Sequence, residues 1–378
     1  MEATSVTGPA KNLIGFCRWA HSPVGATAGL QISIAMYNRG NDSGRQGFAD
    51  AARAAGISTY VIQERGRFDR TVFAQFAKIM ADATPHVIQT HNTKSHLLLK
   101  HLKRPASTPW IAFQHGYQDT DLKLHLYNQL DRWTLRSADR VVSVCRAFTR
   151  RLIAYGVRPE QIRVLHNSVT PTGPVVQEEK EALRRRLGVH PDQAVILTIG
   201  RFSREKGHAD LLQALQPLCL DVQPWKAVLL GDGPEKERLM HLAARLGLSE
   251  RVAFAGFDPY VQPYYAIADV FVLPSHSEGS SNVLLEAMAA RVPIAATSVG
   301  GTPEIVTDGE TALLTAGADP PALAGSLRRL LVDKNLAFGL REAAFDRVLT
   351  RFSPDHYRRA LLGIYTDARR PKLRPDPT

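Results

Sequence analysis

The stretch "AVILTIGRFSREKGHADLLQAL", residues 194–215, holds the structural unit that the rest of the chain repeats. It opens on "AVILTIG", which predicts a strand buried on both faces, because polar and apolar side chains do not alternate along it. A polar loop follows, and "HADLLQAL" then places apolar residues at helical spacing. A buried strand that leads through a loop into an amphipathic helix is typical of parallel βαβ units.

The same alternation of strand and helix extends over the whole chain. Further strands are predicted at residues 30–37, 58–63, 86–90, 110–114, 140–144, 162–167, 226–233, 251–256, 269–274 and 293–298. We therefore predict an α/β protein with two doubly wound, Rossmann-like domains. Ligands bind outside the carboxyl ends of the strands in such sheets, so we expect the two domains to face a cleft.

A segment rich in Pro and Gly, which continues into a charge run, separates the two series of strands. It predicts a first domain at residues 1–172, a linker at 173–190 and a second domain at 191–352. The tail "SPDHYRRALLGIYTDARR" predicts an amphipathic helix over residues 353–368.

The chain has 378 residues, with 47 Lys and Arg against 36 Asp and Glu, which gives a net charge of +11. This balance favours anionic partners such as phosphorylated substrates or an anionic membrane face. Nucleic acid is disfavoured, because no RNP-like aromatic string or zinc-finger spacing occurs. No apolar run approaches the roughly 18 residues of a membrane span, and the N-terminus lacks the features of a secretory signal.

The three cysteines, Cys17, Cys145 and Cys219, are far apart and show no CxxC spacing. They are interpreted as free thiols in a reducing compartment, and a cytoplasmic location is therefore expected. The basic front half would suit docking at the inner, anionic face of the cytoplasmic membrane.

Two polar loops that follow strands carry groups suited to phosphate. In "IGRFSREKG", Arg201 and Lys206 suit a diphosphate, through charge-assisted hydrogen bonds that contribute about 1.5–3 kcal/mol each. The alternative is an exposed basic turn. In "LLGDGPEK", Gly231 and Gly233 allow a ligand to approach the backbone closely. Lys236 stands at the sixth position of the GxGxxG fingerprint, which counts against an NAD enzyme.

The stretch "SEGSSNVLLEAM" predicts a helix whose N-terminus forms an anion site, because the first N–H groups of a helix have no partner within it. Ser280 and Ser281 lie at its start, and Asn282 is the predicted N-cap. Glu278 lies in the preceding loop and Glu286 in the second turn. Two acceptor carboxylates that flank an anion site suit a ligand with hydroxyls on both sides of a phosphate, which is the shape of a nucleotide sugar.

These residues resemble a known family. Glu278 and Glu286 match the E-x7-E motif of the retaining glycosyltransferases of family four, which are two-domain GT-B enzymes. The stretches "GRFSREKGH", "GDGP" and "GGTPEIV" match further motifs of the family in the same order, and together the matches cover most of residues 194–308. The front half is similar more loosely, in "QTHNTKSHLL" and "FQHGY". The resemblance also implies that the helix at 353–368 returns to the first domain.

The resemblance implies roles for the matched residues. Arg201 and Lys206 would bind the donor's diphosphate and stabilise the leaving group. Glu278 would accept hydrogen bonds from the transferred sugar, and Glu286 from the ribose. His115 would reach across the cleft to the sugar; a structural histidine at a strand end is the alternative. The other implied contacts are Gly231, Gly233, Gly279, Ser281, Asn282 and Val283 for the donor, and Gly8 and His91 on the acceptor side.

The implied reaction moves a sugar from a nucleotide-diphosphate sugar to a glycan or lipid-linked acceptor in surface polysaccharide synthesis. It retains the anomeric configuration, and it needs neither a metal nor another cofactor. Asp119 and Asp121 spell DxD, a metal-binding motif of the other large glycosyltransferase fold, but are interpreted as solvent-exposed or helix-start acids. A nucleotide-sugar epimerase or hydrolase, and a non-catalytic sugar-nucleotide binding protein, are the alternatives.

The front of the chain departs from the family pattern. "TGPAKNL" resembles the loop that follows the family's first strand, yet only seven residues precede Gly8. We expect the first strand of this sheet to be missing, either because the natural chain begins upstream or because the protein is shortened. The spacing of Leu13, Phe16 and Cys17 favours a helix over "NLIGFC", with a strand as the alternative.

Overall fold

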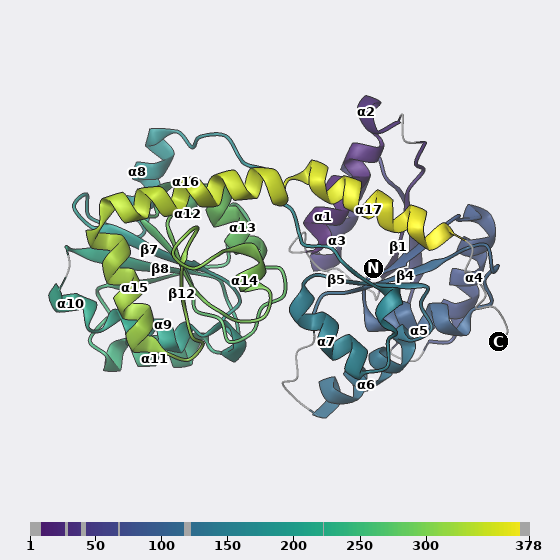
Figure 1. Cartoon of the computed structure of the whole chain (residues 1–378), viewed down its shortest axis with the longest axis horizontal. Coiled ribbons are helices and arrows are strands. Elements are labelled where there is room, and N and C mark those ends of the chain that lie inside the picture. The colour runs from purple at the N-terminus through teal and green to yellow at the C-terminus, as the bar shows by residue number, and fades with distance from the viewer. Residues whose placement is uncertain are drawn as a thin grey trace. The chain divides into compact units, whose positions relative to one another are not determined.

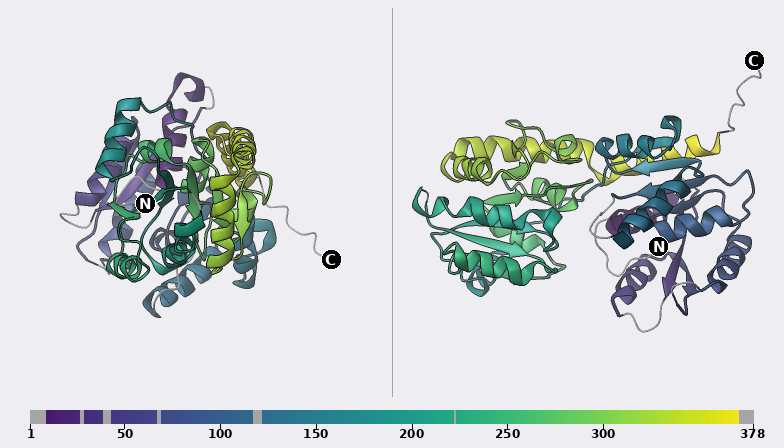
Figure 2. Two further views of the ribbon diagram at one scale, coloured as in Figure 1. Left: turned by 90° about the vertical axis from the view of Figure 1, so that its left-hand side faces the viewer. Right: turned by 90° about the horizontal axis from the view of Figure 1, so that it is seen from below.

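The structure is a computed structural model, and it describes residues 9–26, 29–38, 43–66, 69–116, 122–221 and 223–370. The chain folds into two compact units (Figures 1 and 2). Unit 1 comprises Met1–Asn167 and Pro354–Thr378, and unit 2 comprises Ser168–Ser353. Each unit is α/β with parallel strands, as the sequence predicts.

The core of unit 2 is a parallel sheet of six strands in the order β12-β11-β10-β7-β8-β9. The strands are β7 Ala194–Ile199, β8 Trp225–Leu230, β9 Val252–Gly256, β10 Val270–Leu273, β11 Ile294–Thr297 and β12 Leu313–Thr315. The first five confirm the predicted strands. β12 was not predicted, because its three residues are too few to show a periodicity.

Helices cover both faces of this sheet (Figure 1). They are α8 Gln177–Arg186, α9 His208–Leu215, α10 Leu218–Asp221, α11 Lys236–Arg245, α12 Gln262–Ile267, α13 Asn282–Ala289, α14 Thr302–Ile305, α15 Pro320–Val332 and α16 Lys334–Arg351. Alternate residues of β7 pack into different cores: Leu197 lies with α12, α13 and α16, whereas Ile196 lies with α9, α11 and α15. Both faces of β7 are thus buried, which is why its sequence is a continuous apolar run.

The segment predicted as a linker contains α8. Its charged residues face solvent, but Leu183 and Leu187 are buried in the core of unit 2. This helix is therefore part of the second unit, and the change of unit falls earlier, between Asn167 and Ser168.

The described strands of unit 1 form two parallel sheets rather than one. β1 Ser33–Asn38 pairs with β2 Ser58–Gln63, and a four-stranded sheet has the order β3-β4-β5-β6. These four strands are β3 Ile88–Thr90, β4 Trp110–Gln114, β5 Arg140–Ser143 and β6 Ile162–Val164. All six confirm predicted strands. Among the described residues no strand pairs with both β1 and β3, which is the arrangement that a missing central strand would leave.

The helices of unit 1 include one from each end of the chain. They are α1 Pro9–Ala20, α2 Pro23–Ala26, α3 Ser43–Ala54, α4 Thr71–Ala83, α5 Thr93–His101, α6 Leu122–Leu135, α7 Arg146–Ala154 and α17 Pro354–Arg369. α1 confirms the helix over "NLIGFC" and excludes the strand. Phe16 of α1 and Leu361 of α17 share an apolar cluster with Phe113 of β4, so the C-terminal helix packs within unit 1 (Figure 1).

Two arginines fix the end of α17. The Asp367 carboxylate accepts hydrogen bonds from Arg140 at 2.7 Å and Arg163 at 2.6 Å. The hydrogen bond from Arg140, with the charges of both guanidiniums, lowers the pKa of the Asp367 carboxyl.

In the described part of the chain, no helix has both the length and the apolarity needed to cross a membrane.

Candidate active site

The loops that follow β7, β10 and β11 pack backbone against backbone at the carboxyl edge of the unit 2 sheet. A β-carbon on Gly207 would lie 1.9 Å from the carbonyl oxygen of Pro274, and one on Gly300 would lie 1.9 Å from that of Glu278. Both glycines also have positive φ, +65° and +53°, which L side chains adopt with strain. Glycine at these two positions therefore sets the place of the Glu278 backbone.

Gly231 and Gly233, which follow β8, also allow two backbone segments to pack closely together. A β-carbon on Gly231 would meet the carbonyl oxygen of Gly200 at 1.9 Å, and one on Gly233 would meet that of Phe202 at 2.4 Å. The backbone that packs against these two glycines is thus that of the loop after β7. Their contact with a donor stays a prediction.

Lys206 and Glu278 are brought together. The Lys206 Nζ lies 2.7 Å from Oε1 of Glu278, and the Ser275 hydroxyl donates to the same oxygen at 2.7 Å. Glu278 is only 6% exposed, so its charge is held away from bulk water and is balanced by the ammonium. Ser275 was not predicted from the sequence, although it is buried two residues after β10 ends and three residues before Glu278.

Arg201 does not join this ion pair. Its side chain is exposed, and its guanidinium has no hydrogen bond or ion pair with another residue that the structure describes. In the loop between β7 and α9, Lys206 and Arg204 are thus both ion-paired, Arg204 with Glu235 at 3.7 Å, whereas the Arg201 guanidinium is available to an anion.

The helix that follows Glu278 begins differently from the prediction. α13 starts at Asn282, and its N-cap is Ser281, whose backbone is extended. The prediction of Asn282 as N-cap is wrong, because Asn282 is the first helical residue of α13. Its Oδ1 is buried and has no partner among the described residues. Val283 follows in the first turn, and Gly279 is half-buried in the loop before the helix.

Tyr265 of α12 contacts the second carboxylate. Its hydroxyl donates to the backbone oxygen of Val283 at 2.9 Å and lies 3.3 Å from Oε2 of Glu286. Burial, with a smaller effect of the Glu286 carboxylate, raises the pKa of Tyr265 well above 10, so its proton stays in place. Tyr265 was not predicted as a site residue, because in the sequence it looks like an ordinary core aromatic.

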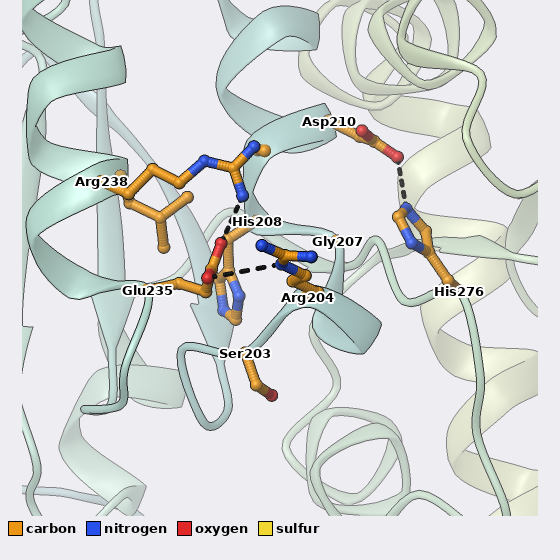
Figure 3. A pocket seen from close by; sticks show the side chains of 10 residues that line it. Ser203, Arg204, Gly207, His208, Asp210, Glu235, Arg238 and His276 are labelled. Atoms are coloured by element: carbon orange, nitrogen blue, oxygen red, sulfur yellow. Dashed lines mark hydrogen bonds and ion pairs between the residues drawn. The ribbon is translucent and has the colours of Figure 1, made fainter. Parts of the chain in front are cut away.

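A pocket of about 420 Å³ lies beside the start of α9 (Figure 3). On one side, the His276 imidazole is 2.6 Å from Asp210; on the other, Glu235 pairs with Arg238 at 2.6 Å. His208 lines the same pocket and is 3% exposed. Burial, with a smaller effect of the nearby ammonium of the β7–α9 loop, lowers the pKa of His208 to about 4.

His115 and His91 lie together in unit 1. The Nδ1 of His91 is 3.1 Å from the Nε2 of His115, and the two rings are within 5° of parallel. Burial, with a smaller effect of His96, lowers the pKa of His115 to about 4. Burial, together with the neighbouring His115, lowers the pKa of His91 well below 6.5.

A buried network holds the backbone next to His115. The Gln114 side chain accepts a hydrogen bond from the Gly116 N–H at 2.7 Å and donates to Asp131 at 2.9 Å. The Asp131 carboxylate in turn lies 2.6 Å from Nδ1 of His96. Gln114 was not singled out in the sequence, since its partners lie on other elements.

Three predicted residues, Gly8, Asp119 and Asp121, lie outside the described residues. Within the described residues, no group of three or more His, Cys, Asp or Glu side chains is arranged to hold a metal ion.

Both halves of the chain match known protein families. Residues 25–168 match the family described as a glycosyl transferase 4-like domain, and residues 179–347 match the family described as glycosyl transferases group 1. The second match contains Arg201, Lys206, Glu278 and Glu286.

Individual relatives agree with these families. The chain is 36% identical over 249 residues to D-inositol 3-phosphate glycosyltransferase of Acidothermus cellulolyticus, an alignment that covers 61% of this chain and 54% of that protein. It is 34% identical over 218 residues to the lipopolysaccharide core biosynthesis glycosyltransferase LpsE of Rhizobium meliloti, over 58% of this chain and 61% of that protein. The aligned region thus spans less than two thirds of either relative.

A solved structure shares the fold. The chain aligns with Anabaena Alr3699/HepE, solved in complex with UDP-glucose, with a TM-score of 0.82 and 20% identity, over 97% of this chain and 98% of that chain. The likeness shows that the two Rossmann-like units form a GT-B fold. With its two halves matched in this order, the chain belongs to the glycosyltransferases that join a 4-like domain to a group 1 domain.

Proposed function

We propose that this protein transfers a sugar from a nucleotide-diphosphate sugar to a hydroxyl of a glycan or lipid-linked acceptor, with retention of configuration and without a metal ion. The observation that carries the proposal is the contact of Lys206 with Glu278, which sets a cation beside a buried acceptor carboxylate at the carboxyl edge of the unit 2 sheet. Ligands of doubly wound sheets bind at that edge. The donor in the aligned HepE structure and the glycan named for LpsE support this choice of substrates.

In this proposal the donor's diphosphate lies near Arg201, Lys206 and the first N–H groups of α13. Negative charge grows on the diphosphate as its bond to the sugar breaks. Fixed cations and N–H groups stabilise that charge without reorganising, and removal of one such group lowers the rate by about 10²–10³. Glu278 accepts hydrogen bonds from the sugar and Glu286 from the ribose. The acceptor hydroxyl attacks from the face that the diphosphate leaves and passes its proton to that leaving diphosphate, so no protein nucleophile is assigned.

The activity is tested on the full chain with UDP-, GDP- and ADP-sugars. Thermal shifts identify the nucleotide, and donor turnover is then followed with and without a panel of glycan and lipid-linked acceptors. Turnover that requires an acceptor supports the proposal, whereas donor consumed without acceptor indicates an epimerase or hydrolase. Binding of the donor without any turnover indicates a non-catalytic binding protein.

Two further measurements test the finer claims. The anomeric coupling constant of the product, measured by NMR, shows whether configuration is retained or inverted. Addition of EDTA should leave the rate unchanged, and a rate that returns only with a divalent cation would contradict metal independence.

We further propose that the acceptor lies at an anionic membrane surface. The net charge is +11, and α7 exposes Arg150 and Arg151. Each basic residue near such a surface contributes about 1 kcal/mol to binding. Sedimentation with vesicles of neutral lipid, alone or mixed with anionic lipid, should show binding only to the mixture, and replacement of both arginines by Glu should weaken it. Equal binding to both kinds of vesicle would contradict the proposal.

A further inference from the structure

A line of four polar side chains runs from α17 to the end of β4 in unit 1. The Tyr365 hydroxyl donates to Oε1 of Gln89 at 2.6 Å, and Nε2 of Gln89 lies 2.7 Å from Nε2 of His91. The Nδ1 of His91 then lies 3.1 Å from Nε2 of His115. Three consecutive hydrogen bonds therefore join Tyr365 to His115, and the first of them links Tyr365 to Gln89, 276 positions away in the sequence.

The donors and acceptors along this line fix where each proton lies. Burial raises the pKa of Tyr365 well above 10, so its hydroxyl keeps a proton that it can donate to Gln89. The Gln89 amide nitrogen can only donate, so Nε2 of His91 accepts. A neutral imidazole that accepts at Nε2 carries its proton on Nδ1. His91 therefore donates to Nε2 of His115.

The same reasoning places the proton of His115. Its Nε2 accepts from His91, so its own proton lies on Nδ1. Since the two ring nitrogens are 3.1 Å apart while the ring centroids are 5.4 Å apart, the ring edges face each other. Both imidazoles are neutral at pH 7, because burial lowers both pKa values, that of His115 to about 4. Two protonated rings would place N–H groups against each other.

The second ring nitrogen of His115, Nδ1, lies outside this line of hydrogen bonds. Its Nδ1 is buried and has no hydrogen-bond partner among the described residues. A buried N–H without a partner is destabilising because it has lost its hydrogen bonds to water, and a ligand oxygen placed there would restore one. The backbone that carries His115 is itself held, since Gln114 bonds the N–H of Gly116.

We propose that Tyr365, Gln89 and His91 are positioning residues that keep the proton of His115 on Nδ1. His115 is then a neutral hydrogen-bond donor to an oxygen acceptor rather than a general base. If the proposed transferase function holds, that acceptor is a hydroxyl oxygen of a bound sugar. The tautomer itself follows from the hydrogen bonds of unit 1 and does not depend on the reaction.

The tautomer is measured directly by NMR on the full chain labelled with ¹⁵N at histidine. Two-bond ¹H–¹⁵N correlations at pH 7.5 distinguish protonated from unprotonated ring nitrogens, and His115→Asn assigns the signals. We expect a protonated Nδ1 and an unprotonated Nε2 for His115. The opposite assignment, which a reversed Gln89 amide would produce, overturns the proposal.

The role of the distant tyrosine is tested by Tyr365→Phe. Loss of its hydroxyl frees the Gln89 amide to reverse, so the His115 signals should move toward a mixture of tautomers. The matched control is Tyr357→Phe, a buried tyrosine of α17 outside the line, which should leave the signals unchanged. Unchanged signals in Tyr365→Phe, with an unchanged melting temperature, would show that Tyr365 does not set the tautomer.

Activity gives a second readout. The amide of Asn is close to the position of Nδ1 and that of Gln to the position of Nε2. His115→Asn should therefore retain kcat/KM within about tenfold, and His115→Gln should lose about 10²-fold, as expected for a missing donor. The reverse order would contradict the donor role. Absence of transfer by the wild-type chain, with the expected tautomer, would refute the proposed function and leave the positioning inference intact.

Discussion

The ammonium of Lys206 lies 2.7 Å from the carboxylate of Glu278, although the two residues are 72 positions apart in the sequence. Lys206 follows β7 and Glu278 follows β10, and these strands are neighbours in the sheet. The pair thus depends on the strand order of unit 2. It joins the cation and the carboxylate for which we propose contacts with the donor.

Lys206→Ala should lower kcat/KM by about 10²–10³, because it removes a fixed cation and leaves a buried carboxylate without its counter-charge. The melting temperature should fall as well. Lys226→Ala is the control: it removes the same charge from the start of β8, at the opposite edge of the sheet, where Lys226 bonds the Glu250 carbonyl. Steady-state kinetics of both variants check this, and equal losses would contradict a specific role for Lys206.

Gly300→Ala should unfold unit 2 at a clearly lower temperature and reduce activity. The new β-carbon would lie 1.9 Å from the Glu278 carbonyl oxygen, at φ +53°. Gly309→Ala is the control, because Gly309 has φ +70° but nothing within 4 Å of its added β-carbon. It should cost only about 1–2 kcal/mol of backbone strain, equivalent to roughly 2–8 °C. Similar melting temperatures for the two variants would show that the loop contact is unimportant.

The stability of unit 2 should fall in mild acid through His208. The pKa of this imidazole is about 4 in the folded chain, against 6.5 for an ordinary histidine. Between these values the unfolded chain binds a proton that the folded chain does not, so the free energy of unfolding rises with pH. The contribution is complete above pH 6.5 and is lost as the pH falls toward 4.

The measurement compares melting temperatures at pH 7.5 and pH 5. The melting temperature of His208→Gln should fall less between these two pH values than that of the wild type, and the difference should be a few degrees. The exposed His241→Gln serves as the control and should match the wild-type slope. If the melting temperature of His208→Gln depended on pH as that of the wild type does, the attribution of this pH dependence to His208 would be contradicted.

Asp367→Asn should destabilise unit 1 by about 1.5–3 kcal/mol, because the carboxylate accepts charge-assisted hydrogen bonds from Arg140 and Arg163. Since the pKa of Asp367 is lowered in the folded chain, this contribution is present above the ordinary value of 3.8 and is lost at more acid pH. Asp355→Asn, at an exposed pair with Arg358, should change stability by less than about 0.5 kcal/mol. Urea unfolding of the two variants tests the difference.

The amino-acid sequence alone was enough to predict eleven of the twelve strands that the structure describes and the helix Pro9–Ala20. Apolar runs such as residues 194–199 and the helical spacing of Leu13, Phe16 and Cys17 are local patterns, and burial acts on them directly. Motif spacing also identified Lys206 and Glu278 as candidates for one site. Each strand, helix or motif is a pattern over residues close together in the chain, although Lys206 and Glu278 belong to motifs 72 positions apart.

Tertiary structure alone decided which side chains meet. The bond of Ser275 to Glu278, the contact of Tyr265 with Glu286 and the bond of Tyr365 to Gln89 leave no periodic mark in the sequence. Hydrogen bonds need donor and acceptor within about 3 Å, and strand order and helix docking set that distance between segments far apart in the chain. Composition and spacing therefore supplied the parts of the site, and packing fixed their partners and the tautomer we infer for His115.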